Sequence, residues 1–269
     1  MKDWNGFKGK AKRLDDIDLV VLADSIGVKE DHIHAFLDVE TRGSGFDGQG
    51  RTIILFEPHV FYRNLSGDKR ARAVREGLAY AKWGQAPYPK DSYPRLLKAI
   101  AIDETAALKS ASWGLGQIMG GNHIAAGYAT VQDMVTAFAD DEENQLSAAV
   151  NFIKANHLDD ELRRHDWAGF ARGYNGPGYA RNKYDVKLAE AFRKWSRIKD
   201  TRFPDVSGIQ PADVSIKPQS IDTKPASVDP VNKPIETRPE VILPPVNPPA
   251  KMNWLNLIWT ALAAMFVRK

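Results

Sequence analysis

The chain has 269 residues, of which 43% are hydrophobic and 26% are charged, so a large part of it can fold around a core. It contains no cysteine, which excludes disulfide scaffolds, thiolate metal sites and cysteine nucleophiles. The 37 basic and 34 acidic residues give a formal charge of +3, a surplus too small to predict a nucleic-acid partner.

The first 198 residues have the pattern of one domain, which we expect to be mostly helical. Its basic N-terminal stretch contains no apolar run of signal-peptide length, so no export signal is expected there. A first helix is predicted at 15–26, capped by Asp15 or Asp16. A second helix is predicted at 32–40, capped by Asp31.

A short β-hairpin is predicted after the second helix. Glycine-rich turns at 43–50 precede β-branched residues at 52–54, which is a hairpin signal. Pro58 then suits the first turn of a helix. Further helical patterns lie at 93–108, 130–138, 142–155, 167–172 and 179–198. One hairpin within many helices predicts an α+β domain that is predominantly α-helical.

Glu40 is the most informative single residue. Ile33, Phe36 and Leu37 precede it by seven, four and three positions, so all four share one helical face that should point inward. Desolvation and the negative end of the helix dipole would both raise the pKa of a carboxyl placed there. A carboxyl that stays protonated near neutral pH suits a general acid for glycosidic cleavage. From spacing alone, the favoured alternative is a glutamate that turns outward to solvent.

Four segments favour the catalytic role of Glu40 over a glutamate that turns outward to solvent. They are FLDVETRGSGF at 36–46, ILFEPHVFYR at 54–63, SASWGLGQIMGGNH at 110–123 and FARGYNGPGYARNKY at 170–184. The third resembles the Gly-Leu-x-Gln-x-Met signature of transglycosylases and goose-type lysozymes, and the fourth resembles their Tyr-Asn-Gly box. The first resembles the segment that bears their catalytic glutamate, and the second is similar to the N-acetylmuramidase domain of phage and prophage endolysins. The resemblance covers roughly residues 15–195 and implies a lysozyme-like fold.

The resemblance also implies the site. Glu40 is expected to be the catalytic acid, and substrate-binding residues are expected in the third and fourth boxes at Ser112, Gln117, Met119, Tyr174 and Asn175. The Gln117 amide can offer a donor and an acceptor to a sugar acetamido group, or else satisfy loop backbone. The Tyr174 hydroxyl is expected to orient Glu40. Asn175 is expected either to bind substrate or to hold a turn.

Glu57 is the second catalytic candidate. Two-carboxylate mechanisms place the second group about 5 to 9.5 Å from the acid, and Glu57 or Asp47 can meet that distance across the predicted hairpin. The alternative for Glu57 is a helix-capping acid. The six histidines have no metal-ligand spacing, so neither a metal nor another cofactor is expected.

The expected reaction is cleavage of peptidoglycan glycan strands between N-acetylmuramic acid and N-acetylglucosamine, for lysis of a Gram-negative host. Attack by water would make the protein a hydrolase, and attack by the 6-hydroxyl of muramic acid would make it a lytic transglycosylase. A membrane-tethered peptidoglycan-binding protein without catalysis is the alternative from another class. The enzyme is expected to act as a monomer.

Two further segments follow the domain. Residues 199–250 are predicted to be a disordered tether, because 11 of the 16 prolines lie between 204 and 249 and no aromatic residue occurs from 204 to 253. Residues 251–269 are predicted to be a hydrophobic, membrane-associating helix, since 252–267 carry no charge. The alternative is a helix that docks on the domain itself. Without an export signal, the domain is expected to begin in the cytoplasm, at the inner membrane.

Overall fold

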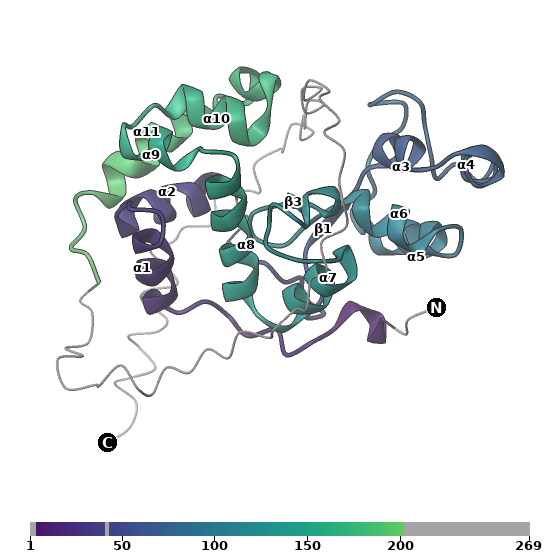
Figure 1. Cartoon of the computed structure of the whole chain (residues 1–269), viewed down its shortest axis with the longest axis horizontal. Coiled ribbons are helices and arrows are strands. Elements are labelled where there is room, and N and C mark those ends of the chain that lie inside the picture. The colour runs from purple at the N-terminus through teal and green to yellow at the C-terminus, as the bar shows by residue number, and fades with distance from the viewer. Residues whose placement is uncertain (1–3, 41–42, 202–269) are drawn as a thin grey trace, which may run out of the picture.

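The computed structural model describes residues 4–40 and 43–201 (Figure 1). Across these residues, α-helices surround a three-stranded antiparallel sheet. The helices are α1 (Asp16–Asp24), α2 (Glu30–Glu40), α3 (Pro58–Asn64), α4 (Gly67–Arg75), α5 (Tyr93–Ile100), α6 (Glu104–Lys109), α7 (Val131–Asp140), α8 (Glu142–Ala155), α9 (Asp159–Arg163), α10 (Trp167–Asn175) and α11 (Tyr184–Trp195). The strands are β1 (Ile54–Phe56), β2 (Ala111–Trp113) and β3 (Ile118–Met119). This architecture confirms an α+β domain dominated by helix.

The helices form two groups, one on each side of the sheet (Figure 1). Helix α2 packs against α1 and α11 in the first group, and α6 packs against α3 and α5 in the second. The first three residues of the predicted tether, 199–201, are described, and the rest of the tether and the predicted tail lie outside the described residues. Within 4–40 and 43–201, no helix is long and apolar enough to cross a membrane.

Side-chain caps set several helix ends. Asp15 accepts hydrogen bonds from the first turn of α1 and completes a capping box with Asp18, as the predicted cap requires. Asp31 does not cap α2, because the helix begins one residue earlier and Asp31 lies in its first turn. The single helix predicted at 93–108 is two helices, since Asp103 accepts from the amide of Ala106 at 2.9 Å and starts α6.

The sheet differs from the predicted hairpin. Within the turn at 43–52 a single isolated bridge joins Phe46 to Thr52, and a second bridge joins Arg51 to Lys8. Strand β1 pairs instead with β2, more than 50 residues further along the chain. Antiparallel pairing of β2 with β3 then makes a hairpin within the third box. In this register, Ser112 lies beside both Leu55 and Met119.

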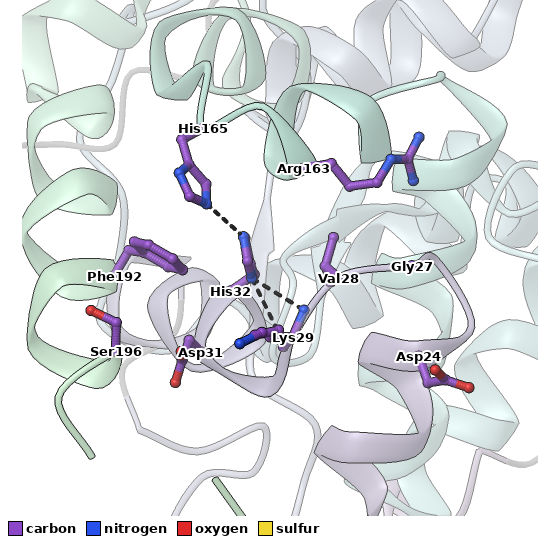
Figure 2. Close-up of a pocket in the computed structure, with 10 residues that line it drawn as sticks. All are labelled: Asp24, Gly27, Val28, Lys29, Asp31, His32, Arg163, His165, Phe192 and Ser196. Atoms are coloured by element: carbon purple, nitrogen blue, oxygen red, sulfur yellow. Dashed lines mark hydrogen bonds between the residues drawn. The ribbon is translucent and has the colours of Figure 1, made fainter. Parts of the chain in front are cut away.

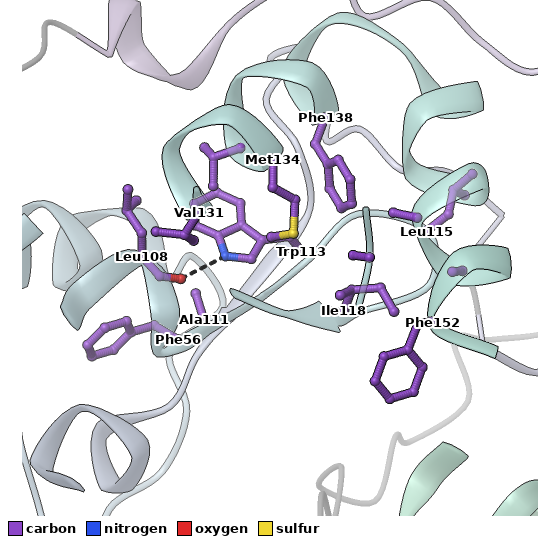
Figure 3. Close-up of a cluster of buried hydrophobic side chains, with 14 of the residues drawn as sticks. Phe56, Leu108, Ala111, Trp113, Leu115, Ile118, Val131, Met134, Phe138 and Phe152 are labelled. Carbon is purple, nitrogen blue, oxygen red and sulfur yellow. Dashed lines mark hydrogen bonds between the residues drawn. The ribbon is translucent and has the colours of Figure 1, made fainter. Parts of the chain in front are cut away.

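The inner face of the sheet is part of the core. Trp113 is fully buried on β2, and its indole nitrogen donates to the carbonyl of Leu108 at 3.0 Å. Met134 and Phe138 of α7 lie close to it in the same cluster (Figure 3). Alternation along the strands places Leu55, Ser112 and Met119 on the opposite face, which we call the outer face. Leu55 and Met119 are half-buried there, so the core does not cover this face completely.

Candidate active site

Glu40 is the last residue of α2. Ile33 and Phe36, on its helical face, are fully buried, while Glu40 is half-buried, so the apolar face points inward as predicted. The side-chain amide of Asn175 donates to Glu40 Oε1 at 2.9 Å. Burial, and then the nearby Glu40 carboxylate, raise the pKa of Tyr184 above its ordinary value. Glu40 therefore lies where α2, the end of α10 and the start of α11 meet.

The β2–β3 turn packs against the same end of α10. The Tyr174 hydroxyl donates to the carbonyl of Gly116 at 2.8 Å. A Cβ added to Gly116 would lie 2.7 Å from the Ala149 Cβ and 3.0 Å from the Tyr174 hydroxyl, so only glycine fits at this position. The hydroxyl of Tyr174 therefore holds the turn through its proton. The next residue, Asn175, donates to Glu40.

Three predicted substrate-binding residues meet on the outer face. Ser112 Oγ donates to Gln117 Oε1 at 2.8 Å, and Gln117 Nε2 donates to the carbonyl of Gly114 at 2.8 Å. Met119 lies beside Ser112 in the strand register. The Gln117 amide thus hydrogen-bonds to the loop backbone, which is the structural one of its two predicted roles. The side-chain amide of Gln117 has a second N–H donor and a second oxygen lone pair, which can bond to a ligand.

Glu57 extends β1 by one residue. Its amide donates to the carbonyl of Ser110 at 2.8 Å, and alternation places its side chain on the outer face with Leu55. Glu57 is the residue before α3, but its side chain makes no capping bond. The buried carboxylate lies 3.2 Å from His59 Nδ1 and accepts a hydrogen bond from the Tyr88 hydroxyl.

Asp47 has a structural role in the turn before β1. Its carboxylate accepts from the amides of Gln49 and Arg51 and pairs with the Arg51 guanidinium at 2.7 Å. Burial raises the pKa of Asp47, but the hydrogen bonds from Arg51 and Gln49 outweigh it, so the pKa lies below its ordinary range. The Asp47 carboxylate therefore holds its own turn.

Two buried polar residues of α8, which sequence reasoning missed, fix the backbone around the site. Glu142 accepts from the amide of Gly45 at 2.7 Å, just after the segment that follows Glu40. Gln145 accepts from the amide of Leu115 at 2.8 Å, within the β2–β3 turn. The first two turns of α8 therefore hold both loops. The only sequence signal was the presence of polar residues on a buried helix.

A separate pocket lies at the opposite end of α2 from Glu40 (Figure 2). It has a volume of about 560 Å³, and none of the predicted site residues line it. His32 and His165 face each other there with their Nε2 atoms 3.2 Å apart. In the part of the chain that the structure describes, no group of three or more histidine, aspartate or glutamate side chains is arranged to hold a metal ion.

A half-buried glutamate at a helix end, beside a small antiparallel sheet in a helical domain, defines a lysozyme-like protein. The N-acetylmuramidase family model matches residues 29–196, and the chain belongs to this family. A crystal structure of a Burkholderia AP3 phage endolysin is 39% identical, with a TM-score of 0.64 over 69% of this chain and 73% of that one. No curated protein matches. The protein is thus a glycoside hydrolase of the N-acetylmuramidase type.

Proposed function

We propose that this enzyme degrades peptidoglycan for host lysis by cleaving the β-1,4 bond between N-acetylmuramic acid and N-acetylglucosamine, with Glu40 as the general acid. The observation that carries the proposal is the half-buried Glu40 carboxyl, held by the Asn175 amide at the C-terminal end of α2. Partial burial and the negative end of the helix dipole both favour its protonated form. The Asn175 amide fixes the orientation of the carboxyl.

The proposed first step is proton transfer from Glu40 to the glycosidic oxygen. The bond to the muramic acid anomeric carbon breaks, and the N-acetylglucosamine unit leaves with the proton as an alcohol. Water then adds to the anomeric carbon and returns a proton to Glu40, so the glycan is hydrolysed with no net change in the enzyme. Glu57, on the outer face of the sheet, is the proposed group that positions this water.

The products test the reaction. We expect isolated peptidoglycan digested by the full chain to yield fragments with reducing-end muramic acid, as measured by mass spectrometry. Fragments that carry a 1,6-anhydro ring would identify a lytic transglycosylase instead. A protein that binds peptidoglycan and releases no fragments would identify the non-catalytic alternative.

Glu40→Gln tests the acid. This variant keeps the shape of the side chain and removes the proton donor, so we expect activity in a zymogram to fall about 100-fold or more. Glu190→Gln is the matched control, because Glu190 is exposed on α11 and should leave activity unchanged. Activity of Glu40→Gln close to that of the wild type would refute the assignment.

We also propose that residues 251–269 associate with the membrane and that 199–250 are their tether. The support is the uncharged run at 252–267, which as a helix would be about 24 Å long against a hydrocarbon core of about 30 Å. The full chain should sediment with membrane vesicles and resist a high-salt wash, because apolar insertion is not screened by salt. A chain truncated after Thr201 should remain in the supernatant. Release of the full chain by salt alone would contradict the proposal.

A further inference from the structure

The segment between α4 and α5 is a long irregular loop, residues 76–92, which we call the 76–92 loop. Loops longer than about 12–15 residues are uncommon in compact domains and usually carry function. This loop is ordered by its own contacts: the Tyr80 hydroxyl donates to the carbonyl of Gly77 at 2.9 Å, and Gln85 Oε1 accepts from the amide of Lys82 at 3.0 Å. The second contact closes a turn at 82–85.

That turn presents Trp83 to solvent. The side chain is 40% exposed, and among the exposed large hydrophobic residues of the described chain Trp83 is the aromatic one. A tryptophan offers a large, flat apolar face with a polar N–H at its edge, which suits a surface that binds a partly apolar ligand.

Contacts connect Trp83 to the outer face of the sheet. The side chain of Trp83 lies close to the Tyr88 hydroxyl, and that hydroxyl donates to the buried carboxylate of Glu57. Glu57 lies about 7 Å along β1 from Leu55, which is the strand neighbour of Ser112. Ser112 in turn donates to Gln117. These contacts link the β2–β3 turn to the 76–92 loop across the outer face of the sheet.

We infer that Trp83 forms a sugar-stacking subsite of the enzyme, which receives a pyranose ring of the glycan strand beyond the ring at the cleaved bond. The axial C–H groups of a pyranose form an apolar face that packs on an indole, while its hydroxyl groups stay hydrated. Tyr88 and Glu57 anchor the loop so that the indole is held in place before substrate binds. This inference rests on the proposed function, since it takes peptidoglycan glycan as the ligand.

The test compares Trp83→Ala with the wild-type full chain on isolated peptidoglycan. We expect KM to rise about 3- to 10-fold, which is the range for loss of one aromatic contact, and kcat to change less than about twofold. Trp83→Phe keeps a ring and should recover most of the lost affinity. Trp195→Ala is the matched control, because Trp195 stacks on His34 of α2, away from the outer face. It should leave KM unchanged.

A binding measurement separates this inference from the proposed reaction. Soluble, uncrosslinked glycan strands are titrated into full-chain Glu40→Gln with and without Trp83→Ala, and the two dissociation constants are compared. A weaker constant with Trp83→Ala supports the subsite even if the wild type releases no fragments, in which case the proposed function alone fails. Equal dissociation constants and equal KM values, with an active wild type, would overturn the subsite alone.

Discussion

The buried histidine of the pocket predicts how the stability of the domain depends on pH. His32 is 6% exposed, and burial lowers its pKa to about 4, with a smaller contribution from His165. In the unfolded chain the pKa of a histidine is about 6.5. Because the folded-state pKa is the lower one, the unfolded state binds more protons between pH 6.5 and pH 4. The free energy of unfolding therefore falls as pH falls through this window.

The expected size follows from the shift. About 2.5 pKa units at about 1.36 kcal/mol each give a loss of about 3 kcal/mol between pH 7.5 and pH 4. Typical domains have about 5–15 kcal/mol in total, so the loss is measurable. Urea unfolding of the wild type and of His32→Phe at several pH values gives the assay. Carboxylates contribute equally to both curves. The free energy of unfolding of the wild type, minus that of His32→Phe, should therefore fall by about 3 kcal/mol between pH 7.5 and pH 4.

A matched variant controls for the loss of a histidine as such. His157 is exposed, so the unfolding free energy of His157→Gln should follow the same pH dependence as that of the wild type. Parallel curves for His32→Phe and the wild type from pH 7.5 to pH 4 would refute the assignment of this acid sensitivity to His32.

Three further predictions concern the site. A Cβ at position 45 would lie 1.9 Å from Gln145 Oε1, so Gly45→Ala should lower the free energy of unfolding by about 1–3 kcal/mol and reduce activity. Gly48→Ala is the control and should do neither, because a Cβ there would have nothing within 4 Å. Equal denaturation midpoints for the two variants would contradict this packing. Glu40→Gln should leave the melting temperature unchanged or higher, since an ionisable group leaves a partly buried site; a clear drop in calorimetry would argue for a structural role. Glu57→Gln should reduce fragment release far more than it reduces the melting temperature, and proportional losses would place Glu57 in the fold alone.

Much of the fold could be predicted because its signals are local. Helix α8 has the predicted bounds, since Asp141 caps its start and its apolar period continues to Ala155. The pairing of β1 with β2 could not be predicted, because strands of three residues have too short a pattern to specify a distant partner.

Some features of the site could likewise be predicted from local sequence, and others could not. The box around Glu40 located that residue, and its apolar helical face showed the direction in which it points. The bonds from Glu142 to Gly45 and from Gln145 to Leu115 join segments 97 and 30 residues apart, and they arise only when the helices pack. Tyr174 and Asn175 were both predicted, but the partner that each side chain meets depends on how the last turn of α10 is rotated.

The contact between Thr201 and Glu30 has a mechanical consequence. Thr201 donates from its amide and its hydroxyl to the two carboxylate oxygens of Glu30, at 2.8 and 2.7 Å, and so Thr201 is held at the first residue of α2. The last residue of the same helix is Glu40, about 15 Å away along the axis. Tension applied at Thr201 would therefore act on two hydrogen bonds to the helix that carries the proposed acid.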